Sequence, residues 1–177
     1  MIVNRGLDQE ADDPKYARFE LERRWLVDTA RRPKLDAHAM TLIEDRYIDG
    51  ARFRLRRMSR PAIDEVKCKL TKKYDCVDPS ARPIVTAYLT PAEYALFRAL
   101  PAHELVKRRY HVPFDGRSWS VDVFEGSLQR LETIECEAES RAALATLVPP
   151  DWALREVTHL PQWQCGSLAA TGAIPED

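Results

Sequence analysis

The sequence predicts an antiparallel β-sheet, open or closed, with helices packed against it. Charged and apolar residues alternate along one segment after another, which is typical of strands whose two faces have different surroundings. About eight such segments stand against three or four helical ones, and most connections between them are of hairpin length. Strands joined by short turns pair antiparallel, so we expect the α+β class.

The opening strand is expected over Phe19–Val27, with the sequence FELERRWLV. Leu21 and Trp25 would lie on one face of this strand. The other face would carry three charged residues, Glu20, Glu22 and Arg24.

A hairpin is predicted next, because Asp49-Gly50 suits a tight turn between Thr41–Ile48 and Arg52–Met58. The second arm of this hairpin alternates between apolar and cationic residues. Its cationic face would carry Arg52, Arg54 and Arg56.

Two further strands are predicted over Glu65–Leu70 and Arg82–Leu89. The first has Lys67 and Lys69 in phase on one face. The second contains Pro83, which cannot donate a hydrogen bond to a neighbouring strand, so we expect it at a sheet edge or at the start of the strand.

Three helices are predicted between and after the strands. The first has Thr90 as its N-cap, a proline at its first position and Glu93 to complete a capping box. Ser140 can cap a second, short helix. The third is expected from about residue 161 to residue 170.

The second half of the chain adds three strands, over Leu105–Val112, Ser118–Phe124 and Thr133–Glu139. Their in-phase charged residues are Lys107 and Arg109 on the first, Asp122 on the second, and Glu135, Glu137 and Glu139 on the third.

Composition limits the classes of function. The net charge is −1 with 31% charged residues, so no single sign of charge coats the protein, and we expect neither nucleic-acid nor membrane binding. The sequence has neither an apolar run of the roughly 20 residues that a membrane helix needs nor an N-terminus like a signal peptide. The four cysteines lack metal-ligand spacing. We therefore expect one cytoplasmic domain over residues 1–177, with residues 1–14 and 171–177 loose.

The charged faces allow two interpretations. In the first, one face of the sheet packs on helices and the charged face is solvated, as in many antiparallel sheets. In the second, the sheet closes into a barrel with the charged face inward. The distribution of sign favours the second, because cations concentrate in the middle strands and carboxylates in the first and last strands.

A closed barrel would have a surplus of cations in its lumen. The eight inward cations would be Arg24, Arg52, Arg54, Arg56, Lys67, Lys69, Lys107 and Arg109, against five carboxylates, Glu20, Glu22, Asp122, Glu135 and Glu137. Repulsion and desolvation would destabilise such a lumen when empty, so it favours an anion. Eight strands leave room for one small ligand, which Arg and Lys could hold as a chain of phosphates, while paired glutamates offer oxygen ligands to Mg²⁺ or Mn²⁺.

In this order, the segments resemble the CYTH-domain proteins of the triphosphate tunnel metalloenzyme superfamily. The opening motif of that family, Glu-x-Glu-x-Lys, is matched by Glu20, Glu22 and Arg24. The other matching stretches are RFRLRR (52–57), EVKCKL (65–70), LVKRRY (105–110), VDVFEG (121–126), ETIECEAES (132–140) and EVTHLPQWQCGSLA (156–169).

The resemblance implies an eight-stranded antiparallel tunnel with flanking helices, in which basic residues hold a triphosphate and acidic residues hold a divalent metal. Carried over by position, the catalytic residues are Glu20, Glu22 and Arg24. The implied phosphate contacts are Arg52, Arg54, Arg56, Lys67, Lys69, Lys107 and Arg109. The implied ligands of Mg²⁺ or Mn²⁺ are Glu20, Glu22, Asp122, Glu135 and Glu137.

Three departures separate this chain from the family pattern. Arg24 stands where the family normally has Lys, and a guanidinium does not give up its proton. The fifth strand lacks the alternating glutamates of many relatives and has Ile84, Thr86 and Tyr88 instead. Residues 161–163 replace a segment that tends to hold an arginine near the tunnel mouth.

The expected function is metal-dependent hydrolysis of inorganic triphosphate or a related small triphosphate. A noncatalytic module that binds polyphosphate or nucleotide is the main alternative, and the missing fifth-strand glutamates favour it. Thiamine triphosphatase and class IV adenylate cyclase activity are further alternatives, as is a barrel without a ligand. We expect a small triphosphate as the partner, and a monomer or homodimer.

Overall fold

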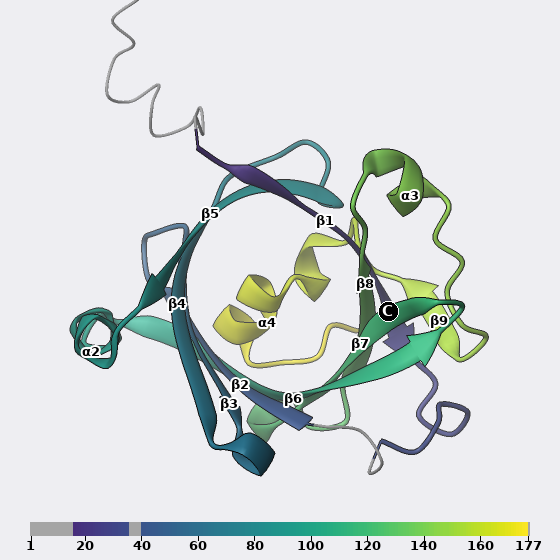
Figure 1. Cartoon of the computed structure of the whole chain (residues 1–177), viewed down its shortest axis with the longest axis horizontal. Coiled ribbons are helices and arrows are strands. Elements are labelled where there is room, and N and C mark those ends of the chain that lie inside the picture. The colour runs from purple at the N-terminus through teal and green to yellow at the C-terminus, as the bar shows by residue number, and fades with distance from the viewer. Residues whose placement is uncertain (1–15, 36–39, 177) are drawn as a thin grey trace, which may run out of the picture.

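The described residues, 16–35 and 40–176, form a closed eight-stranded antiparallel barrel in the computed structural model (Figure 1). The strands are β1 (Arg18–Val27), β2 (Met40–Ile48), β3 (Phe53–Arg60), β4 (Glu65–Lys73), β5 (Ala81–Leu89), β6 (Ala102–Phe114), β7 (Arg117–Phe124) and β8 (Glu132–Glu137). Around the wall they follow the order β5-β4-β3-β2-β6-β7-β8-β1, and pairing of β1 with β5 closes the ring. The closed alternative of the predicted sheet is therefore confirmed.

All eight predicted strands are present, and a short ninth strand, β9 (Ala153–Glu156), was not predicted. It pairs with β1 outside the ring, beside Trp25 and Val27, where the register shifts at an irregularity. Four residues are too few to display a period of two, so the sequence pattern could not reveal it. The N-terminal segment 1–14, which was expected to be loose, lies outside the described residues.

Strand β1 is the seam of the barrel, and this position explains the place of its two glutamates. Its first residues pair with β5, so that Glu20 lies opposite Arg82. Its later residues pair with β8, so that Glu22 lies opposite Glu137. The seam therefore brings carboxylates from the two ends of the chain to one side of the lumen.

The predicted hairpin after β2 is also confirmed, with Gly50 at the positive φ of 65° that such a turn requires. Its register sets the opposite side of the lumen. Asp45 on β2 pairs with Arg56 on β3, and Arg56 in turn lies opposite Lys69 on β4. Cations from two neighbouring strands thus stand at the same level.

The helices follow the predicted signals with one exception. In α2 (Pro91–Arg98) the Thr90 side chain accepts from the backbone N–H of Glu93 in a complete capping box, and Ser140 caps α3 (Arg141–Ala145). The predicted third helix is two pieces, η3 (Pro161–Trp163) and α4 (Cys165–Thr171), because the backbone of Gln164 between them is extended. The remaining short 3₁₀ turns are η1 (Pro61–Ile63) and η2 (Gly126–Leu128).

The hydrophobic core forms two clusters, one on the outer face of the barrel wall and one at the end of the barrel that α4 covers (Figure 1). Trp25 and Trp119 pack with their ring centroids 5.5 Å apart in a cluster that also contains Leu144 of α3 and Trp152. A second cluster joins Leu168 of α4 to the wall. All four tryptophans are buried and belong to these two clusters. Apolar residues therefore cover the outer face of the wall and the end beneath α4, and most of the cavity lining is left for charged residues.

A search of the described helices for a segment both long enough and apolar enough to cross a membrane finds none.

Candidate functional site

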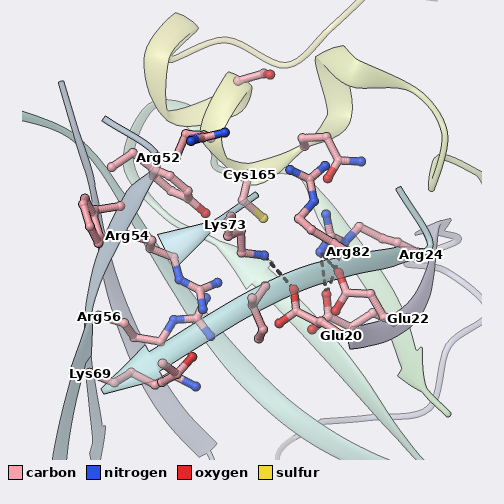
Figure 2. Close-up of a pocket in the computed structure, with 18 of the residues that line it drawn as sticks. Glu20, Glu22, Arg24, Arg52, Arg54, Arg56, Lys69, Lys73, Arg82 and Cys165 are labelled. Carbon is pink, nitrogen blue, oxygen red and sulfur yellow. Dashed lines mark hydrogen bonds and ion pairs between the residues drawn. The ribbon is translucent and has the colours of Figure 1, made fainter. Parts of the chain in front are cut away.

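The barrel encloses a cavity of about 420 Å³. Strands from around the ring supply its charged lining, and α4 with the preceding η3 lies across one end (Figures 1 and 2). At that end Gly166 approaches the ring of Tyr47 so closely that a Cβ on it would lie 3.3 Å from the ring. The residues closing this end are Pro161, Gln164, Cys165, Gly166 and Ser167.

Of the thirteen charged residues predicted for the site, eleven line this cavity. They are Glu20, Glu22, Arg24, Arg52, Arg54, Arg56, Lys69, Lys107, Arg109, Glu135 and Glu137. The interpretation in which the charged face is merely solvated is therefore wrong for these residues.

Lys67 and Asp122 do not line the cavity, and these two predictions need correction. The Lys67 side chain is 52% exposed and pairs with Glu65 at 2.6 Å. Lys69 lines the cavity, and Lys67, two residues earlier on the strand, lies beyond the end of the cavity. Asp122 is fully buried behind the lining, where its oxygens accept two hydrogen bonds of 2.7 Å from Arg109 and a further bond from Lys107. Asp122 therefore supports the wall.

Several charged residues of the site escaped the sequence prediction. Lys73 continues the phase of Lys69 along β4, but the predicted strand ended too early to include it. Asp45 lies buried beneath the arginines of β3, and its phase on β2 with Ile43 and Tyr47 was the available signal. The other charged lining residues that the prediction left out are Arg18, Asp75 and Arg82.

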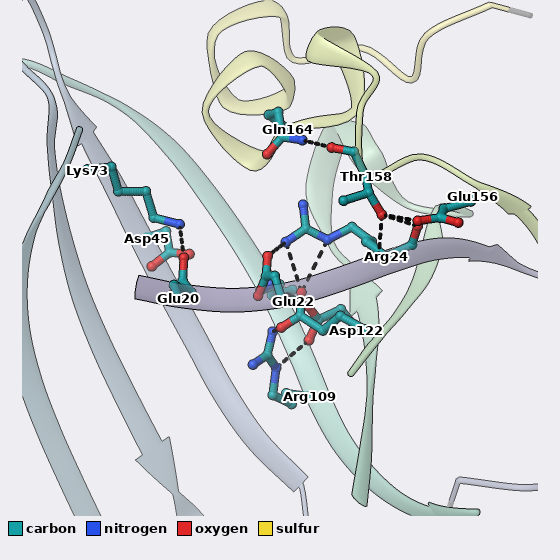
Figure 3. A network of polar contacts seen from close by, with 12 residues as sticks. Glu20, Glu22, Arg24, Asp45, Lys73, Arg109, Asp122, Glu156, Thr158 and Gln164 are labelled. Atoms are coloured by element: carbon teal, nitrogen blue, oxygen red, sulfur yellow. Dashed lines mark hydrogen bonds and ion pairs between the residues drawn. The ribbon is translucent and has the colours of Figure 1, made fainter. Parts of the chain in front are cut away.

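The acidic wall, which we define as Glu20, Glu22, Glu135 and Glu137 on β1 and β8, is neutralised largely by its own cations. Arg24 donates from Nη2 to Glu22 Oε1 at 2.8 Å, and from Nη2 and Nε to Glu135 Oε2 at 2.9 and 3.2 Å (Figure 3). Arg109 donates to the other oxygen of Glu135. Two arginines therefore share one buried glutamate.

The two glutamates of β1 differ in their electrostatic surroundings. Burial would raise the pKa of Glu20, but Lys73, which donates to it at 2.8 Å, and Arg54 outweigh burial and lower the pKa to about 2. Burial raises the pKa of Glu22 to about 7, and nearby Glu135 adds to the rise against the opposing effect of Arg24. At neutral pH Glu22 can therefore accept or release a proton, whereas Glu20 stays ionised.

The cationic wall, which we define as Arg54, Arg56 and Lys69 on β3 and β4, is only partly neutralised. Arg56 forms a two-pronged pair with Asp45, with both N···O distances at 2.6 Å. Arg54 reaches the same carboxylate only at 3.9 Å, and its buried Nε finds no hydrogen-bond partner among the described residues. The wall therefore presents a buried donor that lacks an acceptor.

Lys69 is the other incompletely neutralised member of this wall. It forms no hydrogen bond or ion pair with any residue in the described ranges, 16–35 and 40–176. Burial lowers the pKa of Lys69 to about 8, and repulsion from Arg56 and Arg54 contributes to the fall. An anion in the cavity would relieve this repulsion and satisfy the free donor of Arg54. Figure 2 shows these cations facing Glu20 and Glu22 across the cavity.

The described charges in and beneath the lining leave the lumen cationic, as predicted, although the members differ from those expected. Seven carboxylates belong to it, Glu20, Glu22, Asp45, Asp75, Asp122, Glu135 and Glu137. Ten cations face them, Arg18, Arg24, Arg52, Arg54, Arg56, Lys69, Lys73, Arg82, Lys107 and Arg109.

The acidic wall does not form a ready-made metal site. Within the part of the chain that the structure describes, no three His, Cys, Asp or Glu residues are grouped so that they could hold a metal ion. Both oxygens of Asp122 and of Glu135 already accept hydrogen bonds from cations. Glu20 and Glu22 each accept hydrogen bonds from the described residues through one oxygen only, and Glu137 is exposed at the rim. The residues present thus do not fit a resident metal held by the predicted set of five.

Comparison with solved structures finds the same fold over most of the chain. The inorganic triphosphatase NE1496 aligns with a TM-score of 0.56 and 26% identity, over 89% of this chain and 97% of its own. The PH1819 protein of Pyrococcus horikoshii OT3 aligns with a TM-score of 0.53 and 18% identity, over 71% and 82%. A candidate adenylate cyclase of Bacillus halodurans gives 0.51 and 14%, over 73% and 85%. No protein-family model and no curated protein sequence matches the chain.

Proposed function

We propose that the lumen binds a small inorganic triphosphate and hydrolyses its terminal phosphoanhydride. By its tunnel fold, the chain belongs to the CYTH-domain proteins of the triphosphate tunnel metalloenzyme superfamily. The supporting observation is the cationic wall, in which the buried Nε of Arg54 and the ammonium of Lys69 have no hydrogen-bond acceptor among the described residues. A chain of phosphates supplies several acceptor oxygens and negative charges at once. The likeness to an inorganic triphosphatase across nearly the whole chain supports the same substrate class.

The reaction needs one water molecule and no covalent intermediate. The water oxygen attacks the terminal phosphorus, the bond from that phosphorus to the bridging oxygen breaks, and diphosphate leaves with the bridging oxygen. The proton of the water passes to Glu22, whose pKa of about 7 suits a proton acceptor at neutral pH. Arg54, Arg56 and Lys69 would neutralise charge on the phosphoryl oxygens, which is the main contribution expected in phosphoryl transfer.

In this proposal the divalent cation, Mg²⁺ or Mn²⁺, binds together with the triphosphate and is not held by the protein alone. Hard oxygen ligands suit both metals, and the carboxylates with oxygens left for such an ion are Glu20 and Glu137, while the free oxygen of Glu22 receives the proton. Asp122 and Glu135 instead hold the arginines and Lys107 in place.

A noncatalytic triphosphate-binding module is the second candidate, and one observation favours it. The fifth strand contributes Arg82, Ile84 and Thr86 to the cavity, without any carboxylate, and the Thr86 hydroxyl is already bonded to Thr71 at 3.0 Å. In this alternative the cationic wall still binds the triphosphate, but the cavity has fewer carboxylates that could activate a water molecule.

Phosphate release from tripolyphosphate, ATP and thiamine triphosphate, each with Mg²⁺ or Mn²⁺, tests the proposal. We expect tripolyphosphate to be hydrolysed fastest, and Glu22→Gln to lower that rate by about 10²–10⁴-fold because the proton acceptor is lost. Glu44→Gln is the matched control, since Glu44 lies on the outer face of β2 and pairs there with Arg57. Binding by calorimetry without phosphate release in the wild type would establish the noncatalytic module instead.

A further inference from the structure

Arg24 occupies the space between two carboxylates of the acidic wall. It is 8% exposed, and its guanidinium reaches Glu22 at 2.8 Å and Glu135 at 2.9 Å. The pairing of β1 with β8 sets Arg24 directly opposite Glu135, so the contact follows from the register of the sheet. A divalent ion bridging Glu22 and Glu135 would need the position that this guanidinium holds.

The backbone holds Arg24 in this position from behind. Its N–H donates to Thr158 Oγ1 at 2.9 Å, and its carbonyl accepts from the N–H of Val157 at 2.8 Å. Arg109 donates to the remaining oxygen of Glu135, so rotation of that carboxylate would break a second buried pair. The guanidinium also keeps its positive charge at every accessible pH. Arg24 is therefore a fixed cation.

We infer that Arg24 acts as the built-in counter-ion of the acidic wall and prevents a divalent metal from binding tightly to the protein in the absence of triphosphate. The inference deepens the proposed function and rests on it in one respect, that the reaction takes place in this cavity. A metal would then bind tightly only with the phosphate chain, whose oxygens supply the ligands that Glu135 cannot. Arg24 is in this view a positioning residue for metal entry.

The chemistry of the side chain at position 24 makes this inference specific. A lysine keeps the charge, but its single ammonium lacks the planar fork with which Arg24 spans both carboxylates. A glutamine keeps much of the length and removes the charge. Either change should leave oxygens of Glu22 and Glu135 available to a metal, since both residues line the cavity.

Calorimetric titration of Mn²⁺ into protein freed of phosphate measures the effect directly. We expect Arg24→Lys and Arg24→Gln to bind Mn²⁺ about tenfold more tightly than the wild type or better, in the range usual for groups that tune metal affinity. Arg23→Lys is the matched control, because Arg23 is the next residue on β1 but points outward to Glu156. It should bind Mn²⁺ as the wild type does. Wild-type affinity equal to that of Arg24→Lys would overturn the inference.

Thermal unfolding gives a second measurement in case a variant is destabilised by loss of the buried pair. Mn²⁺ should raise the Tm of Arg24→Gln more than that of the wild type, because a ligand stabilises the state that binds it. If Arg24→Gln does not fold, Arg24→Lys keeps the charge and carries the same comparison. Equal shifts for wild type and variant would contradict the inference. Neither measurement contains triphosphate, so failure here is separate from failure of the hydrolysis assay.

Discussion

The acidic and cationic walls of the lumen belong to the same barrel, yet they differ in how far neighbouring residues neutralise their charges. On the acidic wall, Glu22 lies opposite Glu137, but Arg24 lies opposite Glu135 and its guanidinium pairs with both Glu135 and Glu22. On the cationic wall, like charges face each other, as with Arg56 and Lys69. Opposite cross-strand pairs stabilise a sheet and like pairs destabilise it. The acidic wall is therefore largely neutralised by its own arginines, whereas the cationic wall keeps positive charge that a ligand could neutralise.

The single carboxylate behind the cationic wall makes this contrast measurable. Asp45 is 1% exposed and is the main source of negative charge for the arginines of β3. Arg56 and the neighbouring Arg54 lower the pKa of Asp45 against the effect of burial. Asp45 thus neutralises part of the positive charge of the cationic wall when the cavity is empty.

The largest effect is expected from Asp45→Asn. The substitution leaves Arg56 buried without its carboxylate, and removing one partner of a buried pair lowers the free energy of unfolding by about 3–5 kcal/mol. Tripolyphosphate should recover part of this loss, because it brings negative charge to the same arginines. Thermal unfolding with and without tripolyphosphate measures both effects.

The neighbouring Glu44 provides the control for Asp45. Glu44 is 40% exposed and pairs with Arg57 on the outer face, where an ion pair contributes about 1 kcal/mol or less. Glu44→Gln should therefore change the Tm little, and tripolyphosphate should raise its Tm as it does that of the wild type. If Asp45→Asn proved as stable as Glu44→Gln, the cationic wall would not depend on its buried carboxylate.

Arg54 is the second place at which the two walls can be distinguished. Its buried Nε is the donor that lacks an acceptor, so we expect it to act on the phosphate rather than on the fold. Arg54→Gln should lower kcat/KM for tripolyphosphate by about 10²–10³-fold, the usual loss on removing one fixed donor from a site of charge development. Stability should change less, because the Arg54–Asp45 distance is already 3.9 Å.

Arg57→Gln is the matched control for Arg54, on the same strand but on its outer face. It should keep the wild-type rate of phosphate release. A rate for Arg54→Gln equal to that of Arg57→Gln would remove the cationic wall from the catalytic site and leave the acidic wall as its only candidate.

The sequence predicted these walls to the extent that alternation is a local property. The phase of Arg54 and Arg56 required only that β3 be a strand, and both line the cavity, as does Arg52 directly before the strand. Closure of the sheet was a different matter, because periodicity alone leaves an open sheet and a barrel equally possible. That choice came from the uneven distribution of sign and from the family resemblance.

The sequence alone could not show which residues along the inner face of each strand border the cavity. Lys67, Lys69 and Lys73 share one face of β4. Lys69 and Lys73 line the cavity, whereas Lys67 does not. The difference depends on where the strands cross the barrel axis, which is set by pairing with β3 and β5. The pairing of Arg24 with Glu135 likewise joins residues 111 positions apart and has no local signature.

The smallest predicted effect concerns pH and the cationic wall alone. Burial and repulsion from Arg56 and Arg54 lower the pKa of Lys69 from 10.5 to about 8, so its charged form is lost as pH rises through 8 in the empty protein. Triphosphate favours the charged form, and its affinity should fall by about tenfold between pH 7 and pH 9, as one lysine passes from mostly charged to mostly neutral. Calorimetry at both pH values measures the fall.

Comparison with Lys69→Arg isolates this lysine from the titration of the triphosphate itself, which affects wild type and variant alike. A guanidinium stays charged at pH 9, so the variant should lose less affinity than the wild type over the same range. Lys67→Arg makes the same change on the same strand outside the cavity, and it should lose as much as the wild type. If all three proteins lost affinity equally, Lys69 would not be a phosphate contact, and the incomplete neutralisation of the cationic wall would rest on Arg54 alone.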